Sequence, residues 1–176
     1  MGRPKNFAQK FVEFSNPFLA STAHVFETAC QCSIKPRKLG IKKDTSIREE
    51  IAAFIDVKGH YYHDERKDFF ESLLVFMTPQ KTYLNISSRL LGEEYETMCD
   101  DVRDVGAEFC NMILGNTRPG LKDLGYKISV AIPRMSIGRV SKIPYVADSP
   151  VFILPFESDI GGFQIELCYK LGRTIE

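Results

Sequence analysis

The segment 96–114 carries polar side chains that could act together on another molecule. When successive helix residues are placed about 100° apart, one arc holds residues spaced three or four positions apart: Asp101, Asp104, Glu108, Asn111 and Gly115. A carboxylate can pair with a cation, and an amide both donates and accepts hydrogen bonds without titrating. The pattern predicts a polar ridge, although the solvent face of any amphipathic helix has the same character.

Other reactive side chains form no recognisable site. His60 and His63 could suggest a metal pair, but no third ligand follows at a standard spacing. Cys30 and Cys32 have neither the spacing of a redox Cys-x-x-Cys pair nor that of a zinc knuckle, and 5 cysteines is an odd number. We expect no metal site, no cofactor of the protein's own, and reduced, mostly buried thiols. A small-molecule site near Cys30 and Cys32 is a lesser alternative without a supporting constellation.

The composition is that of an ordinary globular domain. The chain has 176 residues, 44% of them apolar, with 23 Lys plus Arg and 23 Asp plus Glu. The zero net charge gives no general attraction to nucleic acid or to an anionic membrane. The basic cluster at 35–43 contains no aromatic residue that could stack on bases. No run approaches the roughly 18 apolar residues that span a bilayer, so we expect a single cytoplasmic domain over residues 1–176.

Helices are predicted in two regions. Phenylalanines recur at helical spacing between 7 and 14, and Asn16 followed by Pro17 is typical of an N-cap with proline at the first helical position. We therefore predict a helical extension at about 1–15 and a second helix from there to about Cys32. Two further helices are predicted later in the chain: 85–91, closed by Gly92, and 96–114, with Gly115 and Asn116 as its cap.

Strand patterns surround these helices in blocks instead of alternating with them. That arrangement favours an α+β fold, with a roughly six-stranded, mostly antiparallel sheet and helices packed on one face. A polar loop is expected at 60–67. The strand-like segments are 34–41, 50–57, 72–77, 127–133, 137–143, 149–156 and 162–171.

Several motifs occur in an order typical of one known family. They are Asn16-Pro17-Phe18, Leu90-Leu91-Gly92-Glu93-Glu94, Asp104-x-x-x-Glu108-x-x-Asn111-Met112-x-x-Gly115, Pro133, and Pro155-Phe156 with Gly161-Gly162-Phe163. The most specific pattern is Asp or Ser, x3, Glu, x2, Asn, followed about twenty residues later by proline. With these motifs the chain resembles the CheX-type chemotaxis phosphatases of the CheC/CheX/FliY superfamily.

The resemblance implies a CheX/CheC-like fold and hydrolysis of the phospho-aspartate on a CheY-like response-regulator receiver domain. In that family the glutamate, here Glu108, pairs with the receiver's conserved lysine, and the asparagine, here Asn111, places a water in line with the phosphorus. Asp104, Gly115 and Pro133 would bind the partner or support the site. The receiver would supply Mg²⁺, and a homodimer joined through edge strands is expected.

A second Glu-x-x-Asn occurs at Glu13 and Asn16. The related CheC proteins carry two active helices. Here, however, Asn16 is expected at a helix N-cap, where its side chain would bond backbone N–H groups, so the sequence predicts a single site. The main alternative function is a non-catalytic adaptor that binds receivers or flagellar-switch proteins.

Overall fold

The computed structural model describes residues 7–43, 51–129, 131–138 and 143–172. This part of the chain forms the helices α1 (Phe7–Ala29), α2 (Gln80–Leu91) and α3 (Val105–Asp123). The strands are β1 (Lys35–Pro36), β2 (Gly40–Ile41), β3 (Ile51–His63), β4 (Arg66–Thr78), β5 (Tyr126–Ile128), β6 (Arg134–Ile137), β7 (Val151–Glu157) and β8 (Phe163–Gly172). No helix in these ranges combines the length and the apolarity needed to cross a bilayer.

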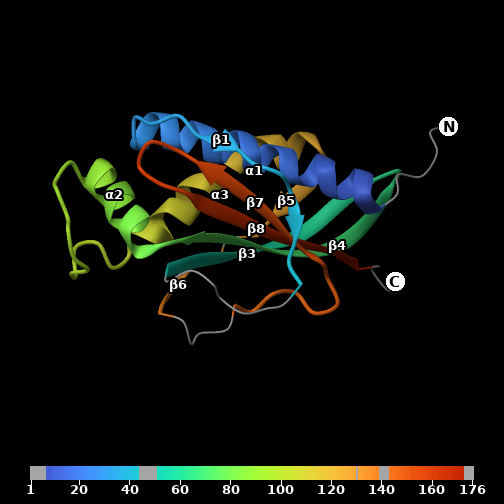
Figure 1. Ribbon diagram of the computed structural model, residues 1–176. Helices are drawn as coiled ribbons and strands as arrows, with labels where there is room; N and C mark the ends of the chain where they lie inside the picture. The colour runs from blue at the N-terminus through green and yellow to red at the C-terminus, as the bar shows by residue number, and fades with distance from the viewer. Residues whose placement is uncertain (1–6, 44–50, 130, 139–142, 173–176) are drawn as a thin grey trace.

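The strands form one antiparallel sheet in the order β1-β7-β8-β4-β3-β5, with β2 beside β7 and β6 beside β3. Helices α1 and α3 cover one face of the sheet, and α2 lies at one end of it (Figure 1). The predicted α+β class is therefore confirmed. Eight strands are described instead of about six, because two short strands in succession line each edge of the sheet.

Helix α1 runs unbroken from Phe7 to Ala29, although Pro17 lies inside it. Its inner face buries four phenylalanines almost completely: Phe11, Phe14, Phe18 and Phe26. Burying one such side chain contributes about 1.5–3 kcal/mol, which offsets the roughly 3 kcal/mol that an interior proline costs. The predicted helix start at Asn16 is wrong, and residues 7–15 are part of α1.

Strands β3 and β4 form a long hairpin with 13 residues in each strand, ending where His63 lies opposite Arg66. Asp64 and Glu65 close the turn with positive φ angles of 45° and 62°. The loop predicted at 60–67 is wrong, because the strands continue and their aromatic rings pack across the ladder. Tertiary pairing has overridden a locally polar sequence.

Further along the chain, after α3, strands β5 and β6 are shorter than the strands predicted at 127–133 and 137–143. Strand β5 ends at Ile128, and β6 occupies Arg134–Ile137. Most of the second predicted segment, 139–142, lies outside the described residues. Both short strands pair with β3, so they complete the edge beside α3.

The core between the helices and the sheet is rich in aromatic rings. Phe26 of α1 stacks on Phe163 of β8 with ring centroids 4.2 Å apart, and it meets Phe109 of α3 edge-on at 5.0 Å. Phe109 in turn lies 5.3 Å from Phe76 of β4. Such contacts add to the energy of area burial, and they fix α1 and α3 relative to the sheet.

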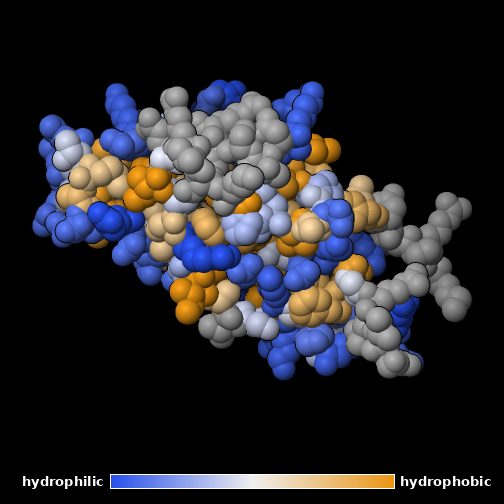
Figure 2. Space-filling view, turned by 90° about the horizontal axis from the view of Figure 1, so that it is seen from below, coloured by the Kyte–Doolittle hydropathy of each residue, from blue (hydrophilic) through white to orange (hydrophobic). Residues whose placement is uncertain are grey.

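The other face of the sheet has its own smaller core, covered by residues 143–146. Seen from this side, apolar and charged side chains are interspersed on the surface (Figure 2). The buried residues of this cluster are Ala52, Phe54, Leu73, Val75, Met77, Ile143, Val151 and Cys168, with Tyr145 and Val146 packed against them.

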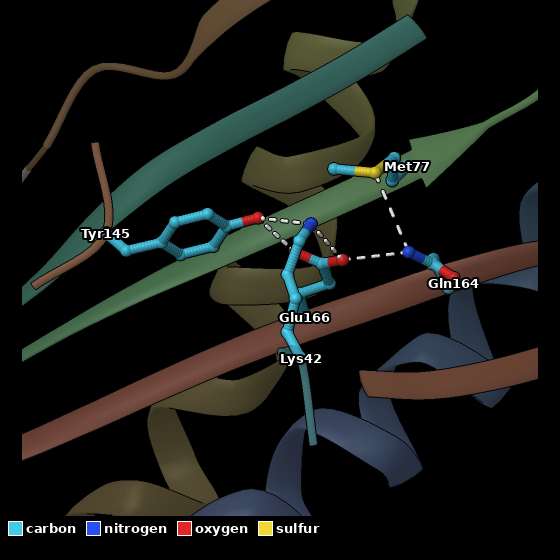
Figure 3. Close-up of polar contacts among 5 residues, drawn as sticks. All are labelled: Lys42, Met77, Tyr145, Gln164 and Glu166. Atoms are coloured by element: carbon cyan, nitrogen blue, oxygen red, sulfur yellow. Dashed lines mark hydrogen bonds and ion pairs between the residues drawn. The ribbon is translucent and has the colours of Figure 1, made fainter. Parts of the chain in front are cut away.

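A buried ion pair lies beside this smaller core (Figure 3). Lys42 Nζ lies 2.8 Å from Glu166 Oε1, and the two side chains are only 6% and 0% exposed. The Tyr145 hydroxyl donates to the same carboxylate and lies 3.0 Å from Lys42 Nζ, while Gln164 Nε2 donates to Glu166 Oε1 at 2.8 Å. Because the carboxylate has three donors, the cost of burying its charge is offset.

Candidate functional site

The predicted polar ridge lies on the outer side of α3. Asp104, Glu108, Asn111 and Gly115 are exposed. The opposite face of the helix is buried in the core. Its buried residues include Phe109, Cys110, Ile113, Leu114 and Leu121. Glu108 and Asn111 therefore project one turn apart from a helix that is held firmly against the sheet.

The limits of this helix differ from the sequence prediction of 96–114. Helix α3 begins at Val105 and continues through Gly115 to Asp123. Gly115 is therefore not a cap, and the Asn116 side chain donates to the Met112 carbonyl at 2.9 Å, inside the helix. The helix continues because Leu121 on its inner face is fully buried, which outweighs the low helix propensity of glycine.

Asp104 stands at the first position before α3. Its backbone carbonyl accepts the Glu108 N–H at 3.1 Å, and its side chain makes no capping hydrogen bond. The carboxylate therefore belongs to the exposed ridge and does not close the helix end. Its negative charge also lies near the positive end of the helix dipole, which is a favourable position.

The side chain that closes the start of α3 is Tyr83 of α2, a residue that the sequence analysis missed. Its hydroxyl donates to the Val102 carbonyl at 2.6 Å and accepts the Gly106 N–H at 3.0 Å. The ring is completely buried, and this burial raises the pKa of Tyr83 to about 12. Tyr83 thus satisfies one of the N–H groups that a helix start leaves unpaired. No local pattern indicates this contact, because 23 residues separate Tyr83 from Gly106.

Gly106 allows the same end of the helix to lie against the sheet, and Pro133 directly precedes the strand that Gly106 meets. A Cβ at Gly106 would lie 3.0 Å from the sulfur of Met135 and 3.1 Å from the Ala53 Cβ, so glycine allows α3 to approach the sheet closely. Pro133 is half-buried and directly precedes β6, the strand that carries Met135. Pro133 is therefore the residue before the strand whose Met135 lies next to Gly106, and it is not part of α3.

The two histidines of β3 are engaged in other contacts. His63 Nε2 lies 2.8 Å from Asp68 Oδ2, and this hydrogen bond lowers the pKa of Asp68. His60 packs its ring edge-on against Phe69 at 6.0 Å. Across the described residues, no group of three or more His, Cys, Asp or Glu side chains gathers where a metal ion could bind.

Cys32 borders a cavity of about 400 Å³, which is the place for the alternative small-molecule site. Burial raises the pKa of Cys30 to about 12, and burial together with a hydrogen bond to Asp159 raises that of Cys32. A thiol acts as a nucleophile through its thiolate, which a raised pKa disfavours. These cysteines are free and buried, as the sequence predicts.

Chemically, the ridge on α3 offers a carboxylate and a primary amide to a molecule that approaches from outside. It contains no nucleophile of its own. An exposed amide can orient a water, and an exposed carboxylate can bind a lysine of a partner. Such a surface suits a reaction whose reactive bond is presented by another macromolecule.

Several solved structures with the same fold are CheC-like or CheX chemotaxis proteins. A CheC-like superfamily protein from Shewanella sp. PV-4 is 29% identical with a TM-score of 0.76, covering 90% of this chain and 98% of that chain. The chemotaxis protein CheX from Vibrio vulnificus is 28% identical with a TM-score of 0.74, over 90% and 99% of the two chains. CheX from Borrelia burgdorferi, solved as a complex with CheY, BeF₃ and Mg²⁺, shares the fold at 22% identity and a TM-score of 0.68, over 91% and 98%.

The family follows from the sequence match. The family model described as chemotaxis phosphatase CheX matches residues 67–157, more than half of the 176-residue chain. This chain belongs to the CheX family. No curated protein matches it.

Proposed function

We propose that this protein hydrolyses the phospho-aspartate of a CheY-like response-regulator receiver domain. The proposal depends on one observation: Glu108 and Asn111 are exposed one turn apart on α3. Membership of the CheX family supports the reaction. The complex of the Borrelia burgdorferi CheX with CheY supports a receiver as the substrate class.

In the proposed mechanism, Asn111 holds a water through its amide group, which can donate and accept at once. The water oxygen forms a bond to phosphorus while the bond from phosphorus to the aspartyl oxygen breaks. The aspartate leaves as a carboxylate, and both water protons remain on the released phosphate. Because phosphoryl transfer passes through a loose transition state, positioning the water lowers the barrier without a nucleophile on this protein.

Glu108 is proposed to pair with a lysine of the receiver and so fix the orientation of the complex. Asp104 and Gly115 extend the ridge at its two ends and would contact the receiver surface. Pro133 would support the site through β6, which packs under the start of α3. The receiver is expected to supply Mg²⁺, which offsets charge on the phosphoryl group.

The test measures phosphate loss from phosphorylated CheY receivers with and without the protein. We expect Asn111→Ala to lower the rate at least about tenfold, because misplacing a reacting group by 1 Å can cost about 10²-fold. We expect Glu108→Ala to raise KM about tenfold, since a charge-assisted hydrogen bond contributes about 1.5–3 kcal/mol.

Asn116→Ala is the matched control. Asn116 is exposed on the same helix, but it bonds the Met112 carbonyl and lies about 140° around the helix from Asn111. It should leave the rate unchanged. A wild-type protein that binds receivers without speeding phosphate loss would refute the proposed reaction and support an adaptor.

We also propose a cytoplasmic homodimer. The described sheet ends at β1 and β2 on one side and at β5 and β6 on the other, and an edge strand can pair with another chain. Phosphorylated receivers are cytoplasmic partners, which supports the location. Sedimentation equilibrium should give twice the 20.0 kDa chain mass, and a monomer at micromolar concentration would contradict the proposal.

A further inference from the structure

A cavity of about 540 Å³ opens at the edge of the sheet, where the last turns of α3 lie beside β5. This volume falls within the roughly 300–1,000 Å³ of small-molecule pockets. The cavity is separate from the ridge residues assigned to the reaction. Its lining includes three cations, two tyrosines and an isoleucine: Arg118, Lys122, Lys127, Tyr62, Tyr126 and Ile128.

The cations of this cavity lack acidic partners. Arg118, Lys122 and Lys127 form no ion pair with any residue that the structure describes. Elsewhere in the described ranges, basic side chains are often paired, as in Lys42–Glu166, Lys58–Glu71 and Arg134–Asp56. Positive charges that border one cavity repel one another. A bound anion would offset that repulsion.

The backbone of β5 adds hydrogen-bond donors to this positive charge. Just before the strand, the Gly125 carbonyl accepts the Tyr62 N–H at 2.9 Å. Backbone groups alternate between the two sides of an antiparallel strand, so the N–H groups of Tyr126 and Ile128 point away from β3. Both residues line the cavity. The edge of a sheet can form an anion-binding concavity in this way.

The cavity also offers an apolar surface to a ring. Tyr62 is 45% exposed, so its ring is accessible to a ligand. Tyr126 is buried, and its ring stacks on Tyr61 with centroids 4.4 Å apart, which makes it a fixed part of the wall. Ile128 is half-buried. A ligand with an aromatic ring and a phosphate group would therefore match both the apolar wall and the cations.

We propose that this cavity binds a nucleotide. The base would stack on Tyr62, since every base presents a flat face to an aromatic side chain. The phosphate oxygens would accept hydrogen bonds from Arg118, whose planar guanidinium matches phosphate geometry, and from Lys122. The N–H groups at the edge of β5 would complete the phosphate site. This binding requires neither the ridge residues nor a receiver.

The position of the cavity connects it to the proposed reaction. Arg118 and Lys122 follow Asn111 by seven and eleven residues, so all three project from one face of α3. The helical rise separates them from Asn111 by about 10 and 16 Å along the axis. A protein interface covers about 800 Å² on each partner, so a receiver docked over Asn111 would reach Arg118. A bound nucleotide should therefore compete with the receiver, a consequence that rests on the proposed function.

The binding test is calorimetric titration of the full chain with ATP, adenosine and inorganic phosphate. We expect one ATP per chain, and at least about tenfold weaker binding of adenosine, because a charge-assisted hydrogen bond is worth about tenfold or more in affinity. Arg118→Glu combined with Lys122→Glu should weaken ATP binding at least about tenfold for the same reason. Tyr62→Ala should weaken it about fivefold or more through the lost stacking.

Lys38→Glu is the matched control. It makes the same charge change at an exposed position between β1 and β2, on the opposite edge of the sheet. It should leave the affinity for ATP unchanged, and circular dichroism should show that every variant is folded. With a phosphorylated CheY receiver as substrate, ATP should raise KM and leave kcat unchanged.

Several outcomes would overturn the nucleotide site. They are no saturable binding of ATP at millimolar concentration, unchanged ATP affinity in the folded Arg118→Glu/Lys122→Glu variant, and inorganic phosphate that binds as tightly as ATP. If ATP does not bind but this variant raises KM for the receiver, the cavity residues dock the receiver instead. ATP binding by a wild type that leaves receivers phosphorylated would support the site and refute only the proposed hydrolysis.

Discussion

The substitution Tyr83→Phe tests whether α2 positions the site on α3. It removes one hydroxyl and keeps the ring, so the core loses no volume. The Val102 carbonyl retains the Val105 N–H at 3.3 Å, but the buried Gly106 N–H loses its partner. A buried donor without a partner costs about 1–3 kcal/mol. A loss of about 2 kcal/mol should lower the Tm of this chain by about 4–8 °C.

The consequence for activity follows from the position of Gly106, two residues before Glu108. Without its cap, the first turn of α3 can shift, and a displacement of 1 Å costs up to about 10²-fold in rate. We expect kcat/KM for phosphorylated receiver to fall at least about tenfold. Rates are measured at 15 °C, where the variant remains folded, alongside thermal unfolding followed by circular dichroism.

Tyr145→Phe is the matched control, because it removes the hydrogen-bonded hydroxyl of a half-buried tyrosine on the opposite face of the sheet. Tyr145 contacts Lys42 and Glu166, which remain paired with each other without it. This variant should lose stability and keep its activity. If Tyr83→Phe loses stability but retains wild-type kcat/KM, then Tyr83 is only structural and the reasoning about positioning is wrong.

Three further results are expected. Gly115→Ala should raise the free energy of unfolding by about 0.5–1 kcal/mol, because a Cβ there meets nothing within 4 Å. It should also lower the affinity for the receiver in titrations. Unchanged affinity would place Gly115 outside the docking surface. Lys42→Met should destabilise by about 3–5 kcal/mol in denaturant unfolding, because it leaves Glu166 as a buried charge, and adding Glu166→Gln should recover at least half of the loss. Maleimide should label only Cys99 rapidly in the native protein, because the other four cysteines are buried. In denaturant it should label all 5 cysteines. Rapid labelling of a second thiol in the native protein would contradict the described core.

Several local features could be predicted from the sequence alone. The apolar period around Phe109 correctly placed Glu108 and Asn111 on the outer face, because a helix repeats every 3.6 residues wherever it begins. Gly92 ends α2 as predicted, with the positive φ of 74° that glycine adopts easily.

Features that depend on distant partners were not predictable in this way. The start of α3 depends on Tyr83, and the length of the β3–β4 hairpin depends on pairing with β8 as well as on its own turn. The burial of Glu166 against Lys42 joins residues 124 positions apart. No window of sequence contains both members of such a pair.

By itself, the sequence determined the α+β class, the exposed phase of Glu108 and Asn111, and the motif that relates the chain to the CheX family. Only the tertiary structure decided that α1 passes through Pro17 and that Tyr83 of α2 closes the start of α3. The physical reason is that periodicity is a property of neighbouring residues, whereas the helix survives its proline through core contacts. The contact between Tyr83 and Gly106 likewise exists only in the assembled fold.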